Sequence, residues 1–350
     1  MTDTIHRNQI LAWLRQDEPR ELERLWALAN ELRARHVGDA VHLRGLVELS
    51  NHCVRACGYC GIRAARAGLE RYRMTVPEIL ACARKAASLG HGTVVLQAGE
   101  DPGLGADDVS AAVREIKQEL GLAVTLSLGE RRDEELAAWR AAGADRYLLR
   151  FETSDAELFR RIHPDLGSRP SDRIAMLGRL RGLGYEIGTG VMVGIPGQSF
   201  ASLADDIALF AELDADMLGV GPFLPHPETP LGRGEWVTPL GLGEQVPNSE
   251  ALVYRTVALA RLACPEANIP STTALATLNK AQGRELGLAR GANVVMPNVT
   301  PPRFRERYEI YPDKACSHET AEACHDVLRT RLHAMGRSVG VGPGSRQRSP

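Results

Sequence analysis

The chain has 350 residues, in which 42 Lys and Arg stand against 44 Asp and Glu. This balance excludes a strong overall field that would attract nucleic acid or an anionic membrane, so we expect neither as a partner. The first residues, Met-Thr-Asp-Thr-Ile-His, contain no basic segment followed by an apolar core, and no apolar run approaches the length of a membrane span. Seven cysteines, three of them close together, favour a reducing compartment, so we expect a soluble cytoplasmic protein.

Two helices are predicted near the N-terminus, within residues 4–36. Apolar residues recur at helical spacing over residues 10–14 and again over 22–32, and Asp17-Glu18-Pro19 separates the two sets. We expect residues 1–40 to form a helical cap on the domain that follows.

Strand and helix signals then alternate along the chain. Residues 41–50 alternate and then run apolar, as a first buried strand would. Thr75-Val76-Pro77-Glu78 is a capping box that opens a helix ending at Gly90, and a second box is predicted at Ser154-Asp155-Ala156-Glu157. Further strands are predicted over residues 93–97, 123–128, 145–151, 186–193, 217–220, 268–272 and 292–296, and further helices over 107–119, 133–142, 199–213, 249–263 and 283–288.

The length alone allows two average domains or one large α/β barrel. Eight strand signals alternating with helices favour a (β/α)8 TIM barrel over a doubly wound sheet, which has fewer strands and a glycine fingerprint at its first turn. We place the barrel over residues 41–324. Residues 325–350 then form a C-terminal helix and a tail, 336–350, whose Gly, Arg, Ser and Pro predict disorder.

Three cysteines, Cys53, Cys57 and Cys60, follow the first predicted strand at CxxxCxxC spacing. Three thiolates can hold three irons of a cubane cluster and leave the fourth iron open as a reaction site. A structural zinc would need a fourth Cys or His, and His52 is too near in sequence to be the usual partner. Three unrelated core cysteines fit poorly with a loop rich in Arg and Gly. The spacing therefore predicts an iron-sulfur site.

Polar and sulfur-bearing residues also gather where the predicted strands end, which is where such barrels place their active sites. They are Cys53, Gln97, Ser127, Glu152, Met192 and Thr272. Glu100 could hold an amine, and Arg150, Glu152 and Arg173 could clamp a zwitterion, although each alone is an ordinary surface charge. The glycine-rich residues 188–197 do not have dinucleotide spacing, so either close approach of a cofactor to the strand or a tight turn explains them.

Several segments resemble the radical S-adenosylmethionine (radical SAM) enzymes and, more closely, the HydE family of FeFe-hydrogenase maturases, which is similar to biotin synthase. The resemblance covers residues 41–324 and separates the chain from biotin synthases and methylornithine synthase. Besides the cysteine motif, with Tyr59 before its last Cys, it rests on Arg71-Tyr-Arg-Met-Thr75, Val95-Leu-Gln-Ala-Gly-Glu-Asp101, Val124-Thr-Leu-Ser-Leu-Gly-Glu130, Ala144-Asp-Arg-Tyr-Leu-Leu-Arg150, Met192-Val-Gly-Ile-Pro-Gly-Gln198, Gly219-Val-Gly-Pro-Phe-Leu-Pro-His-Pro227 and Ala292-Asn-Val-Val-Met-Pro-Asn298.

The resemblance implies that Cys53, Cys57 and Cys60 are the catalytic metal ligands of a 4Fe-4S cluster whose open iron binds SAM. The expected cofactor-binding residues are Tyr59, Glu100, Ser127, Glu152, Arg173 and Met192, of which Ser127, Glu152 and Arg173 match SAM positions of the family. The expected substrate cavity or its anion site is lined by Gln97, Thr125, Arg150, Thr272, Thr273, Met296, Tyr308 and Tyr311.

The implied reaction begins with one electron from a donor protein and yields a 5′-deoxyadenosyl radical from SAM. The implied substrate is an iron carbonyl-cyanide species coordinated by cysteine, made by a sister maturase and used for the di-iron subcluster of the H-cluster. Two alternatives remain open. One is a mutase of the methylornithine-synthase kind, and the other is a non-catalytic iron-sulfur carrier or scaffold.

One departure from the family pattern concerns a second cluster. Some HydE proteins carry three C-terminal cysteines at CxxxxxxxCxxC spacing, whereas here Cys316 and Cys324 match the first two and Val327 occupies the third position. Either His318 or His325 substitutes, or no stable second cluster forms, and we expect the latter. The remaining cysteines, Cys82 and Cys264, are expected to be buried small hydrophobes.

Overall fold

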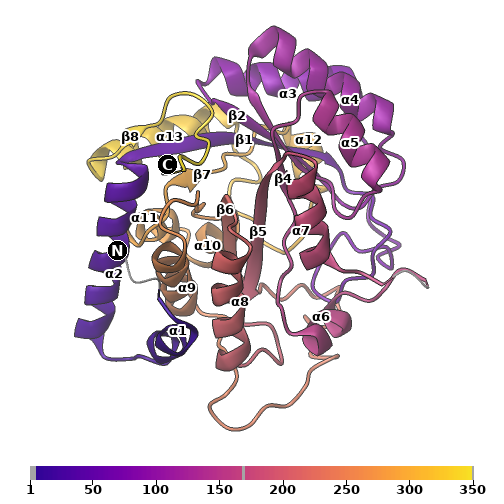
Figure 1. Ribbon diagram of the computed structural model, residues 1–350. Helices are drawn as coiled ribbons and strands as arrows, with labels where there is room; N and C mark the ends of the chain where they lie inside the picture. Colours follow the sequence, from indigo (N-terminus) through magenta and orange to yellow (C-terminus); the bar gives the residue numbers. More distant parts are fainter. Residues whose placement is uncertain (1–4, 168–169, 349–350) are drawn as a thin grey trace.

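The strands of the protein, here a computed structural model describing residues 5–167 and 170–348, form a ring of parallel neighbours (Figure 1). Consecutive strands pair from β1 to β6, and β7 pairs with β1. Single parallel bridges, Met217 to Asn268 and Pro270 to Val294, close the remaining gap. The ring strands are β1 (Ala40–Ser50), β2 (Thr93–Ala98), β3 (Ala123–Ser127), β4 (Arg146–Leu148), β5 (Glu186–Val193), β6 (Met217–Pro222) and β7 (Val294–Val295). The predicted α/β barrel is confirmed.

Three predicted strands are shorter than expected. Of residues 145–151, only Arg146–Leu148 form β4. Residues 268–272 form only the two isolated bridges, and residues 292–296 form only the two-residue β7. Pro270 lies within the former segment and carries no N–H, so a regular ladder cannot run through it.

Helices surround the ring on its outer side (Figure 1). The capping box at Thr75 is confirmed, whereas Asp155 rather than Ser154 caps the next predicted helix start. The sequence patterns did not predict α7 (Arg173–Gly182), α10 (Thr273–Leu278) or α12 (Pro302–Arg305). The helices after β1 are α3 (Val76–Ser88), α4 (Ala106–Glu115) with the π-helical turn η1 (Ile116–Leu120), α5 (Asp133–Ala141), α6 (Ala156–Ile162), α7 (Arg173–Gly182), α8 (Phe200–Glu212), α9 (Glu250–Ala263), α10 (Thr273–Leu278), α11 (Gly283–Ala289) and α12 (Pro302–Arg305).

The two N-terminal helices, α1 (Arg7–Leu14) and α2 (Pro19–Val37), pack on the outside of the barrel against α8 and α9. Their apolar residues Ile10, Leu14 and Leu25 are fully buried. Arg255 of α9 donates to the Leu14 carbonyl at 2.9 Å and pairs with Asp17 at 2.8 Å, which ties the helical hairpin to the barrel. No helix in the described part of the chain combines the length and the apolar character needed to cross a membrane.

The C-terminal segment corrects the expectation of a disordered tail over residues 336–350. After α13 (Ala321–Ala334), β8 (Ser338–Val339) pairs in parallel with the start of β1. The following carbonyl groups then cap cations inside the barrel: Gly344 accepts from Arg44 at 3.0 Å, and Pro343 accepts from Arg146 at 3.1 Å. Residues 336–348 are therefore held by the amino ends of the strands, and residues 349–350 lie outside the described residues.

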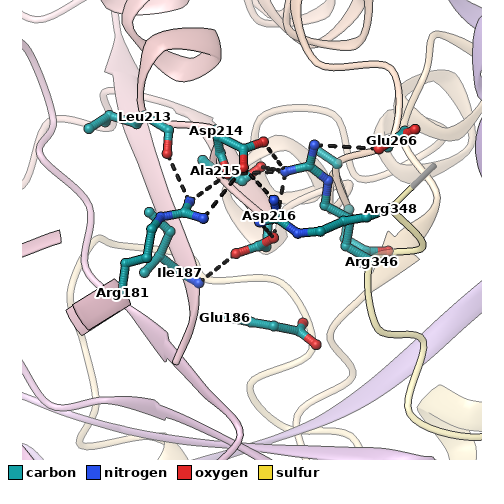
Figure 2. Close-up of polar contacts among 12 residues, drawn as sticks. Arg181, Glu186, Ile187, Leu213, Asp214, Ala215, Asp216, Glu266, Arg346 and Arg348 are labelled. Atoms are coloured by element: carbon teal, nitrogen blue, oxygen red, sulfur yellow. Dashed lines mark hydrogen bonds and ion pairs between the residues drawn. The ribbon is translucent and has the colours of Figure 1, made fainter. Parts of the chain in front are cut away.

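Two tail arginines, Arg346 and Arg348, pair with the aspartates that precede β6 in the sequence (Figure 2). Arg346 pairs with Asp214 at 2.6 Å, and Arg348 pairs with Asp214 at 2.5 Å and with Asp216 at 2.8 Å. Asp216 also accepts the Ile187 N–H at 2.9 Å at the start of β5. The composition of the tail did not predict its order, because the tail is held by ion pairs and backbone hydrogen bonds rather than by burial of apolar side chains.

Candidate functional site

The cysteine loop begins at the carboxyl end of β1. The side chain of Arg71 closes it by donating hydrogen bonds to backbone carbonyl groups of the loop. The guanidinium of Arg71 donates to the carbonyl groups of Asn51, Ile62 and Arg63, the last two at 2.7 and 2.8 Å. The Asn51 side chain in turn donates to the Glu70 carbonyl at 2.9 Å and accepts the Tyr72 N–H at 2.7 Å. These contacts join the two ends of the loop, so the motif has one defined shape.

Three glycines let this loop pack closely against its neighbours. A Cβ at Gly61 would lie 2.2 Å from the Glu309 carbonyl oxygen, and one at Gly99 would lie 2.3 Å from that of His52. A Cβ at Gly58, between the second and third cysteines, would lie 2.7 Å from the Trp236 ring. The backbone contacts at Gly61 and Gly99 leave no room for a side chain, and Gly58 could gain one only if Trp236 moved.

The three motif sulfurs lie in a setting suited to a cluster. Cys57 is buried, and desolvation raises the pKa of Cys60 to about 12 and that of Cys57 well above its usual range. Backbone N–H groups of Arg55 and Glu100 point at the Cys53 sulfur. Because iron must replace the protons of such thiols, the donors match a site that is completed by a cationic metal group.

The spread of these sulfurs also distinguishes a cluster from a single ion. In the described parts of the chain, the groups of three ligand atoms that lie within 4.8 Å of one another are Cys316, Glu319 and Cys324, and Glu100, Glu130 and His163. The three motif cysteines are not among them, so their sulfurs are farther apart than the ligands of one zinc ion would be.

A buried network of two arginines and two glutamates adjoins the motif. Arg55 pairs with Glu100 at 2.5 Å and with Glu130 at 3.0 Å, and Arg173 pairs with the same two carboxylates at 3.2 and 3.1 Å. Although burial opposes it, the charges of Arg173 and Arg55 and the hydrogen bond from Ser171 lower the pKa of Glu130. Each Glu100 oxygen contacts one arginine, so this carboxylate joins Arg55 and Arg173, and its remaining lone pairs can still accept from an amine.

Glu152 and Arg150 lie beyond β4, facing the inside of the ring. Glu152 adopts a left-handed backbone with φ 64°, and its backbone bridges Val191 of β5. Its Oε2 atom is 3.0 Å from Arg150 Nη2 but has no hydrogen-bond partner. The fully buried hydroxyl of Thr125 on β3 is also without a partner. Unpartnered buried polar atoms and local strain are typical of a binding site.

Tyr59 and Met192 belong to one small apolar cluster on the same side of the barrel. Met192 is buried there, and the Tyr59 ring packs against the group. The other members are Leu158, Ile162, Ile195, Phe223 and Leu231. This surface could cover the apolar face of an adenine.

The glycines of residues 188–197 allow two strands to approach closely and form a tight turn. A Cβ at Gly190 of β5 would lie 2.0 Å from the Gly219 carbonyl oxygen of β6, so the two strands need glycine to approach. Gly194 and Gly197 have φ of 83° and 92° and form the tight turn. On β6, a Cβ at Gly221 would lie within 4 Å of Arg150 and Thr272 without a clash, so the β6 glycines leave room next to Arg150.

The remaining predicted cavity residues come from β2, α10 and the segments after β7. Gln97 donates to the Tyr308 hydroxyl at 3.3 Å, which brings two of them together. Thr272 caps α10 and donates to the Val220 carbonyl at 3.2 Å, and Thr273 is the first residue of that helix. Met296 and Tyr311 are half-buried. Ser127 ends β3 in register with Gln97.

Sequence reasoning missed the buried pair Glu48 and Lys314. Lys314 Nζ lies 2.8 Å from Glu48 Oε1 and 2.9 Å from the Tyr308 carbonyl. Burial raises the pKa of Glu48 against the opposing charge of Lys314. A glutamate between Val47 and Leu49 in an apolar strand was the signal that could have revealed it.

A cavity of about 580 Å³ opens beside the ring between α10, α11 and α13. It shares Tyr308 and Tyr311 with the predicted substrate cavity, includes Lys314, and does not include the cysteine motif. Cys316 and Cys324 line it with Glu319 nearby, whereas His325 faces His91 at 3.4 Å and His318 faces Glu306 at 3.3 Å. Neither histidine takes the place of a third cysteine. Cys82 and Cys264 are buried, as predicted.

Comparison with known proteins agrees with this geometry. The model of the radical SAM superfamily matches residues 47–210. The FeFe-hydrogenase maturase subunit HydE of Thermotoga maritima is 45% identical over 93% of this chain and 89% of that protein. The 3-methylornithine synthase of Methanosarcina barkeri is 29% identical over 84% of this chain and 79% of that protein. Among solved structures, methylornithine synthase (PylB) superposes with a TM-score of 0.78 at 25% identity, over 96% of this chain and 94% of that one.

The radical SAM match covers the cysteine loop and the strands that carry most of the predicted SAM contacts, and the HydE similarity extends over nearly the whole chain. Radical SAM enzymes use a 4Fe-4S cluster and SAM, which agrees with the three motif thiols described above. The chain is a radical SAM enzyme and belongs to the HydE family.

Proposed function

We propose that this enzyme acts in maturation of FeFe-hydrogenase, on a cysteine-bound iron carbonyl-cyanide precursor of the di-iron subcluster. Cys53, Cys57 and Cys60 are the ligands of its 4Fe-4S cluster in this proposal. The observation that carries it is the loop of three thiols, two of them with strongly raised pKa values, at the carboxyl end of β1 in a chain 45% identical to a HydE protein. When bound, the reduced cluster supplies the electron that cleaves SAM to a 5′-deoxyadenosyl radical.

The residues around the motif suit a SAM molecule. The Glu152 carboxylate, whose Oε2 atom lies 3.0 Å from Arg150 Nη2 but accepts no hydrogen bond, can bind an amine or a ribose hydroxyl. Ser127 offers a hydroxyl at the end of β3. Tyr59 and Met192 offer apolar surface for the adenine. Arg173 and Glu100 hold this side of the site through their ion pair at 3.2 Å.

The inside of the ring suits an anionic substrate that must be kept from water. Arg150 supplies a half-buried guanidinium beside the β6 glycines, and the Thr125 hydroxyl has no protein partner. Gln97, Thr272, Thr273, Met296, Tyr308 and Tyr311 complete the proposed lining. A radical generated there is protected from competing hydrogen donors because the surrounding side chains exclude solvent.

Anaerobic reconstitution with iron and sulfide tests this proposal. The wild type should show the EPR signal of a reduced 4Fe-4S cluster that changes on addition of SAM, and it should release 5′-deoxyadenosine. Cys57→Ala should lose both, whereas Cys264→Ala, a buried cysteine at the end of α9, should keep both. Retained 5′-deoxyadenosine in Cys57→Ala would contradict the ligand assignment.

Three assays distinguish the competing functions. A synthetic cysteine-bound iron carbonyl-cyanide complex should be consumed together with SAM and give a new paramagnetic species. Conversion of lysine to methylornithine would instead identify a mutase of the methylornithine-synthase kind. A cluster that is transferred to a partner without any 5′-deoxyadenosine would identify a carrier. A sister maturase that supplies the substrate and a one-electron donor are the further partners proposed.

A further inference from the structure

His163 follows α6 and lies directly against the middle cysteine of the motif. Its side chain is fully buried, and its Nδ1 atom is 3.0 Å from the Cys57 sulfur. The contact is reinforced through the backbone, because Gly58 N–H donates to the carbonyl of Ile162 at 2.7 Å. The ring of Phe159 lies beside the imidazole with centroids 5.0 Å apart. The backbone contact fixes the position of His163 next to the Cys57 sulfur.

The contacts of the other imidazole nitrogen, Nε2, indicate which nitrogen of His163 carries the proton. His163 Nε2 lies 3.3 Å from Arg173 Nη2 and 3.3 Å from Glu130 Oε1. A guanidinium can only donate, so it favours a lone pair on Nε2 and a proton on Nδ1. Glu130 does not require the Nε2 proton, because Arg55, Arg173 and Ser171 already donate to it.

A cysteine that binds iron is a thiolate and can only accept a hydrogen bond. The nitrogen that faces Cys57 must then be the donor, which agrees with the proton on Nδ1. A hydrogen bond to a ligand sulfur stabilises the more negative, reduced state of an iron-sulfur cluster and so raises its reduction potential. We propose that His163 is a positioning residue that donates from Nδ1 to the Cys57 sulfur and raises the reduction potential of the cluster.

This inference rests on the proposed role of Cys57 as a cluster ligand and concerns how readily the electron for SAM cleavage is accepted. The contacts to Cys53 and Cys60 come from backbone N–H groups, which substitution cannot remove. His163 instead contributes a side chain, so its effect can be measured separately. The charged groups around the imidazole are two arginines and two glutamates joined by ion pairs, so their formal charges cancel. They are Arg55, Arg173, Glu100 and Glu130.

The test is an EPR-monitored redox titration of the reconstituted protein without SAM. His163→Phe should lower the midpoint potential by at least about 59 mV, a tenfold change in the equilibrium constant of a one-electron reduction. His163→Asn can place an amide N–H near the position of Nδ1 and should recover most of this shift. Cys264→Ala, which removes a buried side chain at the end of α9, should keep the wild-type potential.

A second measurement uses the wild type labelled with ¹⁵N-histidine. Pulsed EPR of its reduced cluster should detect a histidine nitrogen coupling that is lost in His163→Asn. Normal cluster content with an unchanged potential in His163→Phe would overturn the inference, and so would a wild-type cluster without any histidine coupling. The labelling result decides the matter if His163→Phe assembles no cluster. Failure of the wild type itself to assemble a cluster would instead contradict the proposed function.

Discussion

Glu48 and Lys314, separated by most of the chain, form an ion pair of 2.8 Å in which both side chains are nearly inaccessible to solvent. Glu48 belongs to β1 next to Gln97, and Lys314 also donates to the Tyr308 carbonyl. The pair therefore joins the first strand to the segment after β7 at the wall of the proposed cavity.

Removal of one partner of this pair should be strongly destabilising. Lys314→Met leaves the Glu48 carboxylate buried without a cation, which costs about 3–5 kcal/mol. The double variant Glu48→Gln with Lys314→Met should recover most of that loss, because no charge then remains buried. The measurement is the free energy of unfolding of the two single variants and the double variant in a double-mutant cycle. Equal stability of Lys314→Met and wild type would show that the pair does not hold the segment.

Arg71 should be needed for cluster assembly through the shape of the loop. Arg71→Ala removes the donors to four carbonyl groups of the loop, and hydrogen bonds from a charged group contribute about 1.5–3 kcal/mol each. We expect the iron and sulfide bound after reconstitution to fall to less than about half of the wild-type amount.

The matched control is Arg307→Ala, because Arg307 pairs only at the surface with Glu70, and exposed pairs contribute little. Its iron content should equal that of the wild type. An Arg71→Ala protein with full iron content would contradict the role given to the guanidinium.

Asp206 should make the stability of the protein depend on pH. Burial raises the pKa of this carboxyl from 3.8 to about 7, against hydrogen bonds from Ser154 and Thr153 that favour the charged form. Between these two values the folded state holds a proton that the unfolded state has lost. The free energy of unfolding should therefore fall as pH rises from about 4 to 7, by about 1.4 kcal/mol per unit at most.

Asp206→Asn should flatten this part of the profile, because the amide does not titrate. The change can be followed by chemical unfolding at pH 5, 6, 7 and 8. Since Asp206 accepts the Ser154 N–H at 2.5 Å, just beyond Glu152, the same variant reports on the loop that carries this residue. Identical pH profiles for the variant and the wild type would refute the titration of Asp206.

The C-terminal tail should stabilise the barrel. Deletion of residues 342–350 removes the carbonyl acceptors of Arg44 and Arg146, two nearly fully buried cations, and we expect a loss of about 3 kcal/mol or more. Arg348→Ala removes only a half-exposed cation and should cost about 0–1 kcal/mol. Thermal unfolding midpoints compare the two, and a deletion with the wild-type midpoint would contradict the anchoring of the tail.

The barrel and the position of the motif were predictable because both depend on local patterns. Alternation of strands and helices and the capping box at Thr75 are set by neighbours in the sequence, and parallel strands bring their carboxyl ends to one side. That is why Cys53, Gln97, Ser127 and Glu152 could be placed together before any contact was known.

The sequence by itself therefore determined the fold, the ligand type and the side of the barrel that carries the site. Only the tertiary structure decided the partners of the charged groups: His163 with Cys57, Lys314 with Glu48, and the tail with Arg44 and Arg146. Such pairs join residues 106 to 300 positions apart and have no period along the chain. They are set by which side chains the closed ring brings within hydrogen-bonding distance in a setting where an unpaired charge is costly.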